Sequence, residues 1–221
     1  MCWNEHVSLN TFLFSMFVLF LIIYNNAYTQ YKIKDLNNPW MYLFFASFIF
    51  MQLIEFFIWR NIDNKFYNNI FSTMAAALII FQPIASLMLL SNVSLRNTLL
   101  SIYIATAVPY FIYKFLTHTM HSTVSKNGHL NWVFSDPNGV FFGNTPFAFV
   151  CWLFFFLFSL FYERNWFGFL FGFLSMCIFY YNYAKEHTFG SMWCWIVNSI
   201  MIYYAFYLLL YLPFCEKKKL C

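Results

Sequence analysis

Charged residues are scarce in this chain. Asp, Glu, Lys and Arg make up only 9% of its 221 residues, whereas hydrophobic residues make up 62%. Ordinary soluble domains carry roughly a quarter charged residues, so the composition excludes that class and indicates an integral membrane protein. The net charge of +4 is spread thinly along the chain, which argues against a nucleic-acid partner.

Cysteine motifs are also missing. The six cysteines form no CxxC pair, and no Cys and His residues have the spacing of a zinc finger, so neither a redox motif nor a structural metal site of that kind is expected. Cysteines in membrane helices usually act as small apolar side chains, and we assign them no role. The sequence identifies no cofactor and does not decide the oligomeric state.

The signatures of better-known membrane proteins are absent as well. The last apolar stretch has no lysine at mid-membrane depth, which opposes a retinal-binding opsin, and the chain has no DRY or NPxxY receptor motif. Its halves share no motif, so an inverted-repeat transporter is not indicated. Glu5 but no Lys or Arg precedes the first apolar stretch. A secretory signal begins with positive charge, so we expect that stretch to remain as a membrane helix.

Long apolar stretches are what the chain has in abundance. Seven of them approach the roughly 20 residues that an α-helix needs to cross a bilayer, and they are continuous rather than alternating, which favours helices over barrel strands. We therefore predict an all-α fold, in which residues 1–221 form one integral membrane bundle of about seven transmembrane helices. The predicted helices are residues 10–28, 40–59, 70–91, 98–117, 145–162, 166–184 and 189–212.

The positions of the 12 Lys and Arg residues predict an orientation, because short cytoplasmic loops collect basic residues. With seven crossings, seven of them lie on the side of the C-terminus and five on the other side. We therefore expect the N-terminus outside or in a lumen and the C-terminus in the cytoplasm. The seven are Lys32, Lys34, Arg96, Arg164, Lys217, Lys218 and Lys219.

The C-terminal tail, residues 215–221, reads CEKKKLC. Lys218 and Lys219 stand four and three residues from its end, which resembles the dilysine signal that retrieves eukaryotic membrane proteins to the endoplasmic reticulum. The alternative is a polybasic flank that is attracted to anionic lipid.

Residues 118–144 form the one long polar segment. Loops of this length are often functional or disordered, and Asn127-Gly128 is a turn signal within it. Residues 129–134 are amphipathic enough to lie at the membrane interface, where Trp132 would act as an anchor.

The acidic residue Glu55 lies near the end of the second predicted helix. An ionisable side chain inside a membrane is costly and indicates a functional site by default. Gln52, Glu55 and Trp59 are spaced i, i+3 and i+7, so they share one helix face, which we expect to face the bundle interior. Glu55 is then a proton site, a cation site or a catalytic acid, or else a structural carboxyl bonded to a neighbouring helix.

Two more polar features lie in apolar surroundings. Pro83 removes a backbone hydrogen bond from the third helix and frees a carbonyl that must find another partner, so the adjacent Gln82 is a candidate for lining a cavity. Ser191, Trp195 and Asn198 recur at i, i+4 and i+7 on the last helix. This stripe either joins helices through hydrogen bonds or lines a pocket with the acid of the second helix.

Histidines offer a possible metal site. His118 and His121 are spaced i and i+3, and His187 is placed on the same membrane side by the predicted topology. A zinc site would need a third ligand besides that pair, so convergence of all three would be required.

The segments MQLIEFFIW (51–59), QP (82–83), GHLNW (128–132) and GSMWCW (190–195) resemble a family of uncharacterised seven-pass membrane proteins of giant DNA viruses and some marine microbes. The resemblance spans most of the chain. It implies a virus-like source and brings no known activity.

Three functions fit these features. The first is a small-molecule or ion-handling protein, similar to a transporter or channel, with an intramembrane polar site of Gln52, Glu55, Gln82 and Asn198. The second is a membrane-embedded, metal-dependent lipid hydrolase with Glu55 as acid or base. The third is a structural or membrane-remodelling protein without enzymatic activity. The expected partners are the lipid bilayer and a small ligand or ion, and whether the protein is an enzyme stays open.

Overall fold

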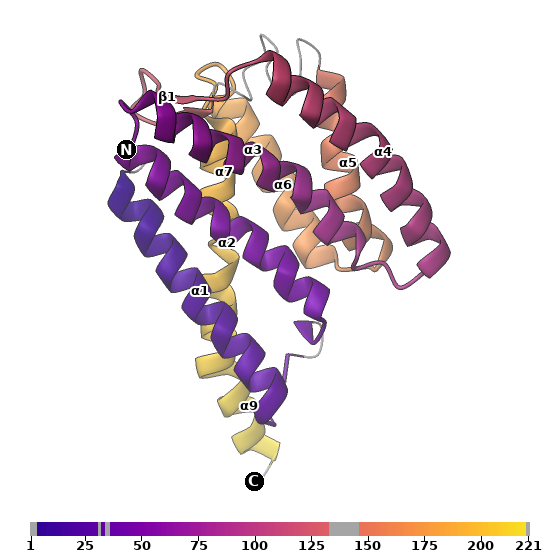
Figure 1. Cartoon of the computed structure of the whole chain (residues 1–221). Coiled ribbons are helices and arrows are strands. Elements are labelled where there is room, and N and C mark those ends of the chain that lie inside the picture. The colour runs from indigo at the N-terminus through magenta and orange to yellow at the C-terminus, as the bar shows by residue number, and fades with distance from the viewer. Residues whose placement is uncertain (1–3, 31, 34–35, 133–145, 220–221) are drawn as a thin grey trace.

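The chain folds into an all-α bundle, seen here in a computed structural model (Figure 1) that describes residues 4–30, 32–33, 36–132 and 146–219. A small two-stranded hairpin lies at one end of the bundle. The elements in order are α1 (Glu5–Tyr28), α2 (Pro39–Arg60), α3 (Lys65–Leu87), α4 (Val93–Thr117), β1 (Ser122–Val124), β2 (Leu130–Trp132), α5 (Pro146–Tyr162), α6 (Trp166–Tyr183), α7 (Phe189–Val197), α8 (Ile200–Phe206), η3 (Tyr207–Tyr211) and α9 (Leu212–Lys219).

Six helical segments of the described chain are long and apolar enough to cross a membrane, and the last of them runs through α7, α8 and η3 into α9. The remaining predicted crossing, residues 145–162, corresponds to α5. Its 17 residues are at the short end of the range for a spanning helix. Many large apolar side chains face outward along these helices, among them Phe17, Phe154 and Ile178. This surface suits contact with lipid.

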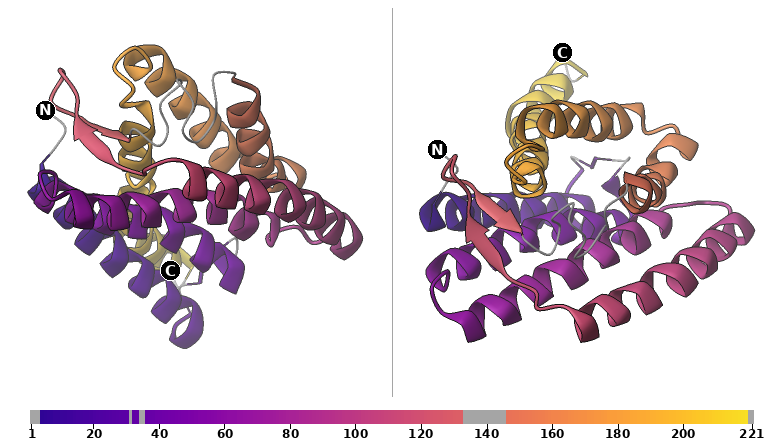
Figure 2. Two further views of the ribbon diagram at one scale, coloured as in Figure 1. Left: turned by 45° about the horizontal axis from the view of Figure 1, so that its top comes forward. Right: turned by 90° about the horizontal axis from the view of Figure 1, so that it is seen from above.

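The first four helices pack in chain order, and α7 contacts both α6 and α2. α2 lies between α1 and α3, whereas α4 lies on the outside against α3 (Figure 2). α5 packs on α3, α6 packs on α7, and α7 reaches back to α2. The core between these helices contains Ile49, Met51, Phe156 and Trp193, all fully buried or nearly so.

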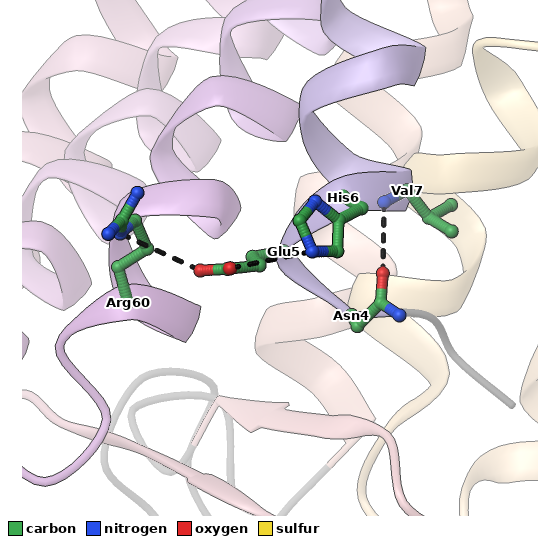
Figure 3. Close-up of polar contacts among 5 residues, drawn as sticks. All are labelled: Asn4, Glu5, His6, Val7 and Arg60. Atoms are coloured by element: carbon green, nitrogen blue, oxygen red, sulfur yellow. Dashed lines mark hydrogen bonds and ion pairs between the residues drawn. The ribbon is translucent and has the colours of Figure 1, made fainter.

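The start of α1 and the end of α2 lie at the same end of the bundle. The Glu5 carboxylate is 3.6 Å from Arg60 Nε and 3.7 Å from His6 Nε2 (Figure 3). Asn4 caps α1, because its side-chain oxygen accepts the N–H of Val7 at 3.2 Å. The two chain termini lie at opposite ends of the bundle (Figure 1).

Pro83 does not end its helix, since α3 continues to Leu87. A proline cannot donate to the carbonyl four residues earlier, and here that carbonyl, on Ile79, accepts the indole N–H of Trp152 at 2.8 Å. The expectation that the freed carbonyl needs another partner is confirmed. The same hydrogen bond joins α5 to α3.

The last crossing is one helical segment, Phe189–Cys215, as predicted for residues 189–212, but its hydrogen-bond pattern changes between α7 and α8. The backbone N–H groups of Asn198 and Ser199 bond to carbonyls three residues earlier, at 3.0 and 2.9 Å. The side chain of Asn198 donates instead to the Cys194 carbonyl at 2.8 Å. Side chains that compete for backbone groups in this way disturb helical hydrogen bonding. The predicted crossing is present, and the change at Asn198 and Ser199 is a local one that we did not predict.

Part of the long polar segment is a hairpin, which we did not predict. β1 and β2 pair antiparallel with Ser122 opposite Trp132, and Gly128 has φ of 78° at the turn, which confirms the Asn127-Gly128 turn signal. Trp132 is only 2% exposed because it packs over Gly190, where an added Cβ would come within 3.0 Å of the ring. The expectation that it anchors in the membrane interface is therefore wrong. Residues 133–144 of the predicted segment lie outside the described chain.

The hairpin is fastened to the helices by side-chain amides. Asn68 on α3 donates to the Ser122 carbonyl at 2.9 Å and accepts the Ser122 N–H at 2.8 Å, as a neighbouring strand would. Asn127 in the turn donates to Thr188 Oγ1, just before α7, at 3.0 Å. The hairpin thus links α3 to the start of α7.

Candidate functional site

A polar seam runs between α2 and α7, and we define it by Gln52 and Glu55 on α2 with Ser191, Cys194 and Asn198 on α7. Gln52 and Glu55 are 0% and 2% exposed, and Gln52 Nε2 donates to Glu55 Oε2 at 2.7 Å. Their spacing puts them on one helix face. The prediction that this face turns into the bundle is confirmed by their burial.

The α7 side of the seam lies against these two residues. Ser191 is within hydrogen-bonding reach of the Glu55 carboxyl, and Cys194 is within electrostatic range of it. Asn198 Nδ2 lies 3.4 Å from the carbonyl of Phe48, one turn before Gln52 on α2. The fold therefore brings Ser191 close to Glu55 and joins Asn198 to α2 through a hydrogen bond, which agrees with the interpretation of the α7 stripe as a set of contacts between helices.

The seam contains more oxygen acceptors than donors. Gln52 Oε1, Glu55 Oε1 and Asn198 Oδ1 are buried without a hydrogen-bond partner among the described residues. Buried acceptors normally have partners, and leaving one unpaired costs about 1–3 kcal/mol. A buried carboxyl oxygen without a partner, beside the Gln52 amide, suits a bound proton or a cation that prefers oxygen ligands.

Gln82 occupies a separate place. Its side chain is fully buried, and neither amide atom has a hydrogen-bond partner in the described part of the chain. It lines a cavity of about 30 Å³ together with Trp132, Trp193 and Cys194, which is room for a water molecule. Gln82 thus lines a cavity, as we predicted. Cys194, a residue of the seam, lines the same cavity.

The two tryptophans that we predicted near the pocket, Trp59 and Trp195, are not part of the seam. Trp195 donates its indole N–H to Thr11 on α1 at 3.2 Å, so its side chain is used in packing α7 against α1. Trp59 is half-buried and packs against the hydrophobic core. Both residues stabilise helix contacts.

The predicted histidine set is not assembled. Within residues 4–30, 32–33, 36–132 and 146–219, no group of three or more His, Cys, Asp or Glu side chains could hold a metal ion. His118 contacts the Thr117 hydroxyl at 2.7 Å and His121 the Thr119 carbonyl at 3.4 Å, each within its own local segment. His187 has a positive φ of 56° in the turn before α7.

A vestibule that we did not predict opens toward the end of the bundle that carries the C-terminus. This cavity of about 610 Å³ lies between the α1–α2 connection, the α5–α6 turn and α8. Its polar and aromatic lining includes Asn38, Glu163, Arg164, Asn165, Trp166 and Tyr203. Its residues come from four distant parts of the chain, so only the polar Glu163–Asn165 turn stands out in the sequence.

An apolar cleft of about 40 Å³ continues from the vestibule, because Met41, Leu160, Asn165 and Tyr204 line both. Trp193 lines this cleft and also lines the small cavity beside Gln82. Trp193 donates to Ser175 Oγ at 3.0 Å and packs edge-on against Trp152 and Phe156. Its side chain therefore lines both the cleft and the small cavity.

The helices and the buried polar seam together define a multi-pass membrane protein. Comparison with protein families, with curated proteins and with solved structures found no match. The resemblance to seven-pass proteins of giant viruses therefore stays a prediction.

Proposed function

We propose that the protein moves a small cation or a proton across the membrane, and that Glu55 is the group that binds it. The observation that carries this proposal is the buried Glu55 Oε1, which has no described partner and lies in a seam of unpaired acceptors. An ionisable residue inside a membrane bundle usually marks an ion or proton pathway.

Two further features support the proposal. The α7 helix is interrupted at Asn198, beside Gln52, and transporters often bind ions where membrane helices are discontinuous. The vestibule and the cleft share lining residues, and Trp193 lines both the cleft and the small cavity beside Gln82.

The test is ion flux into liposomes that contain the purified protein, with a pH-sensitive dye for protons and radioactive sodium for Na⁺. Glu55→Gln keeps the shape of the side chain and removes its charge. We expect it to lower the flux by about tenfold or more, the effect of losing one charge-assisted contact, while the protein remains folded by size-exclusion chromatography. Glu5→Gln, which removes a carboxylate at the end of the bundle, should keep the wild-type flux.

The alternatives predict other results. If Glu55 is only structural, Glu55→Gln will change yield and melting temperature, and flux through the two proteins will be equal or absent in both. No feature of the described residues favours the lipid hydrolase.

We also propose that the C-terminus is cytoplasmic and that the tail retrieves the protein to the endoplasmic reticulum. The excess of Lys and Arg on the C-terminal side supports the orientation. The positions of Lys218 and Lys219 support the retrieval signal.

A further inference from the structure

The vestibule contains a guanidinium without a counter-charge. Arg164 lines the cavity, and the ion pairs of the described chain do not include it. The neighbouring carboxylate is already engaged, because Glu163 Oε1 accepts the N–H and the hydroxyl of Ser91 at 2.7 and 2.8 Å. The vestibule therefore presents a guanidinium that makes no ion pair with any described residue, beside a carboxylate that is held by Ser91.

Arg164 stands where the backbone favours glycine. Its φ is 59°, in the left-handed region, at the end of α5. The N–H of Arg164 bonds to Phe161 and that of Asn165 to Leu160, at 3.2 and 2.9 Å, which is the hydrogen-bond pattern of a helix end that usually carries glycine. A residue with a Cβ is disfavoured in this conformation, so the arginine is kept at a cost to the backbone.

The start of α6 adds donors to the same cavity. The first N–H groups of a helix have no acceptor inside the helix. Asn165 Oδ1 accepts the one of Gly168 at 3.0 Å, whereas those of Trp166 and Phe167 have no acceptor in the described chain. Both residues line the vestibule, and free N–H groups at a helix start favour a bound anion.

The cleft behind the vestibule has the opposite chemistry. Its walls are mainly aromatic and aliphatic side chains of α2, α5 and α6, including Phe44, Phe45, Phe156 and Phe171. Its volume of about 40 Å³ admits only the narrow end of an apolar chain. A ligand that fills both spaces has an anionic head and an apolar tail.

We infer that the vestibule binds a phospholipid, with its phosphate at Arg164 and the start of α6 and one acyl chain entering the cleft. A phosphate oxyanion matches the planar guanidinium, which donates two parallel hydrogen bonds. The position of the cavity at the end of the bundle puts the head where lipid headgroups lie. This inference stands whether or not the protein transports a cation.

The experiment measures binding to the full-length protein in detergent with three probes: dihexanoyl phosphatidylglycerol, glycerol 3-phosphate and dihexanoylglycerol. The first carries both head and tail, the second only the phosphate head and the third only the tail. We expect the phospholipid to bind at least about tenfold more tightly than either part, because each part loses the contacts of the other.

Two arginine variants locate the site. Arg164→Gln should weaken phospholipid binding by about tenfold, the cost of one charge-assisted contact. Arg96→Gln removes the same charge on the same side of the bundle but outside the vestibule, and should bind as wild type. Equal weakening in both variants would show a general charge effect and overturn the site.

Other outcomes are equally decisive. Arg164→Gly relieves the left-handed backbone, so it should melt at a higher temperature than wild type and still lose binding; wild-type binding by this variant would overturn the inference. Glycerol 3-phosphate binding as tightly as the phospholipid would replace the lipid with a soluble phosphate ester. Equally tight dihexanoylglycerol would remove the phosphate from the site.

Discussion

The Ile79 carbonyl shows how one residue type forces a tertiary contact. Pro83 cannot donate to this carbonyl, and the Trp152 indole donates to it instead. The bond is buried, so neither group can exchange its partner for water. The carbonyl that lacks its helical donor in α3 therefore accepts a hydrogen bond from α5, and this bond joins the two helices.

Trp152→Phe tests this link. The variant keeps an aromatic ring but leaves the Ile79 carbonyl buried without its donor, so we expect the free energy of unfolding to fall by about 1–3 kcal/mol, measured by denaturation in detergent. In a Pro83→Ala background the new N–H can bond to Ile79, and the cost of Trp152→Phe should shrink by about 1 kcal/mol. An equal cost in both backgrounds would mean that Trp152 acts only by packing.

Spacing made the burial of Gln52 and Glu55 predictable. Both residues follow the helical repeat, and polar side chains in lipid turn inward. Their hydrogen bond at 2.7 Å also follows from i, i+3 spacing. The partners on α7 were expected only as an alternative, because residue spacing fixes a helix face but not the helix opposite.

Among the elements, the hairpin is the part that sequence reasoning described least well. Its strands have three residues each, too short for a clear alternating pattern. It exists because Asn68 and Asn127 hold it to the helices and because Gly190 leaves room for Trp132. Such contacts depend on the packed bundle.

Asn68→Ala should release the hairpin. The variant removes both hydrogen bonds to Ser122, so we expect hydrogen exchange of residues 122–132 to become about tenfold faster or more, while the core of α2 stays protected. Asn182→Ala is the matched control, since the exposed Asn182 bonds only to the Ile178 carbonyl within α6. Unchanged exchange in Asn68→Ala would show that the Asn127–Thr188 bond and the packing of Trp132 are enough to hold the hairpin.

The interruption of α7 is the second element-level difference. Residues 189–212 read as one apolar stretch, and hydropathy does not register which hydrogen bonds the backbone makes. The Asn198 side chain reaches the Cys194 carbonyl at 2.8 Å and the Phe48 carbonyl at 3.4 Å. The α-helical hydrogen-bond pattern is thus interrupted at Asn198, which is a residue of the seam.

At the scale of the whole molecule, the bundle has two different ends. The N-terminus, the Glu5–Arg60 ion pair and the hairpin gather at one end, whereas the C-terminus lies at the other (Figures 1 and 2). The vestibule opens toward the latter. The two ends therefore offer different surfaces to the two sides of a membrane.

Epitope tags at the two termini test the orientation. In cells whose plasma membrane alone is permeabilised, antibodies should reach the C-terminal tag and not the N-terminal one, because the basic excess keeps the C-terminal side in the cytoplasm. The reverse pattern would show the opposite insertion.

The tail can be tested in the same cells. Replacing Lys218 and Lys219 by Ser should move the protein beyond the endoplasmic reticulum, as seen by microscopy, whereas Lys217→Ser should leave it there. If the two variants behave alike, the lysines act as a basic flank.

Residue patterns alone predict the class of the protein, the approximate positions of its apolar helices and which residues share a helix face. These follow from local physics: a bilayer requires about 20 apolar residues in hydrogen-bonded helical form, and the helical repeat assigns each side chain to a face. Only the tertiary structure decided that Asn198 meets Phe48, 150 residues away, that a hairpin covers Gly190, and that Arg164 opens into a vestibule. These contacts depend on how faces distant in the chain are paired, and many pairings satisfy the same apolar pattern equally well.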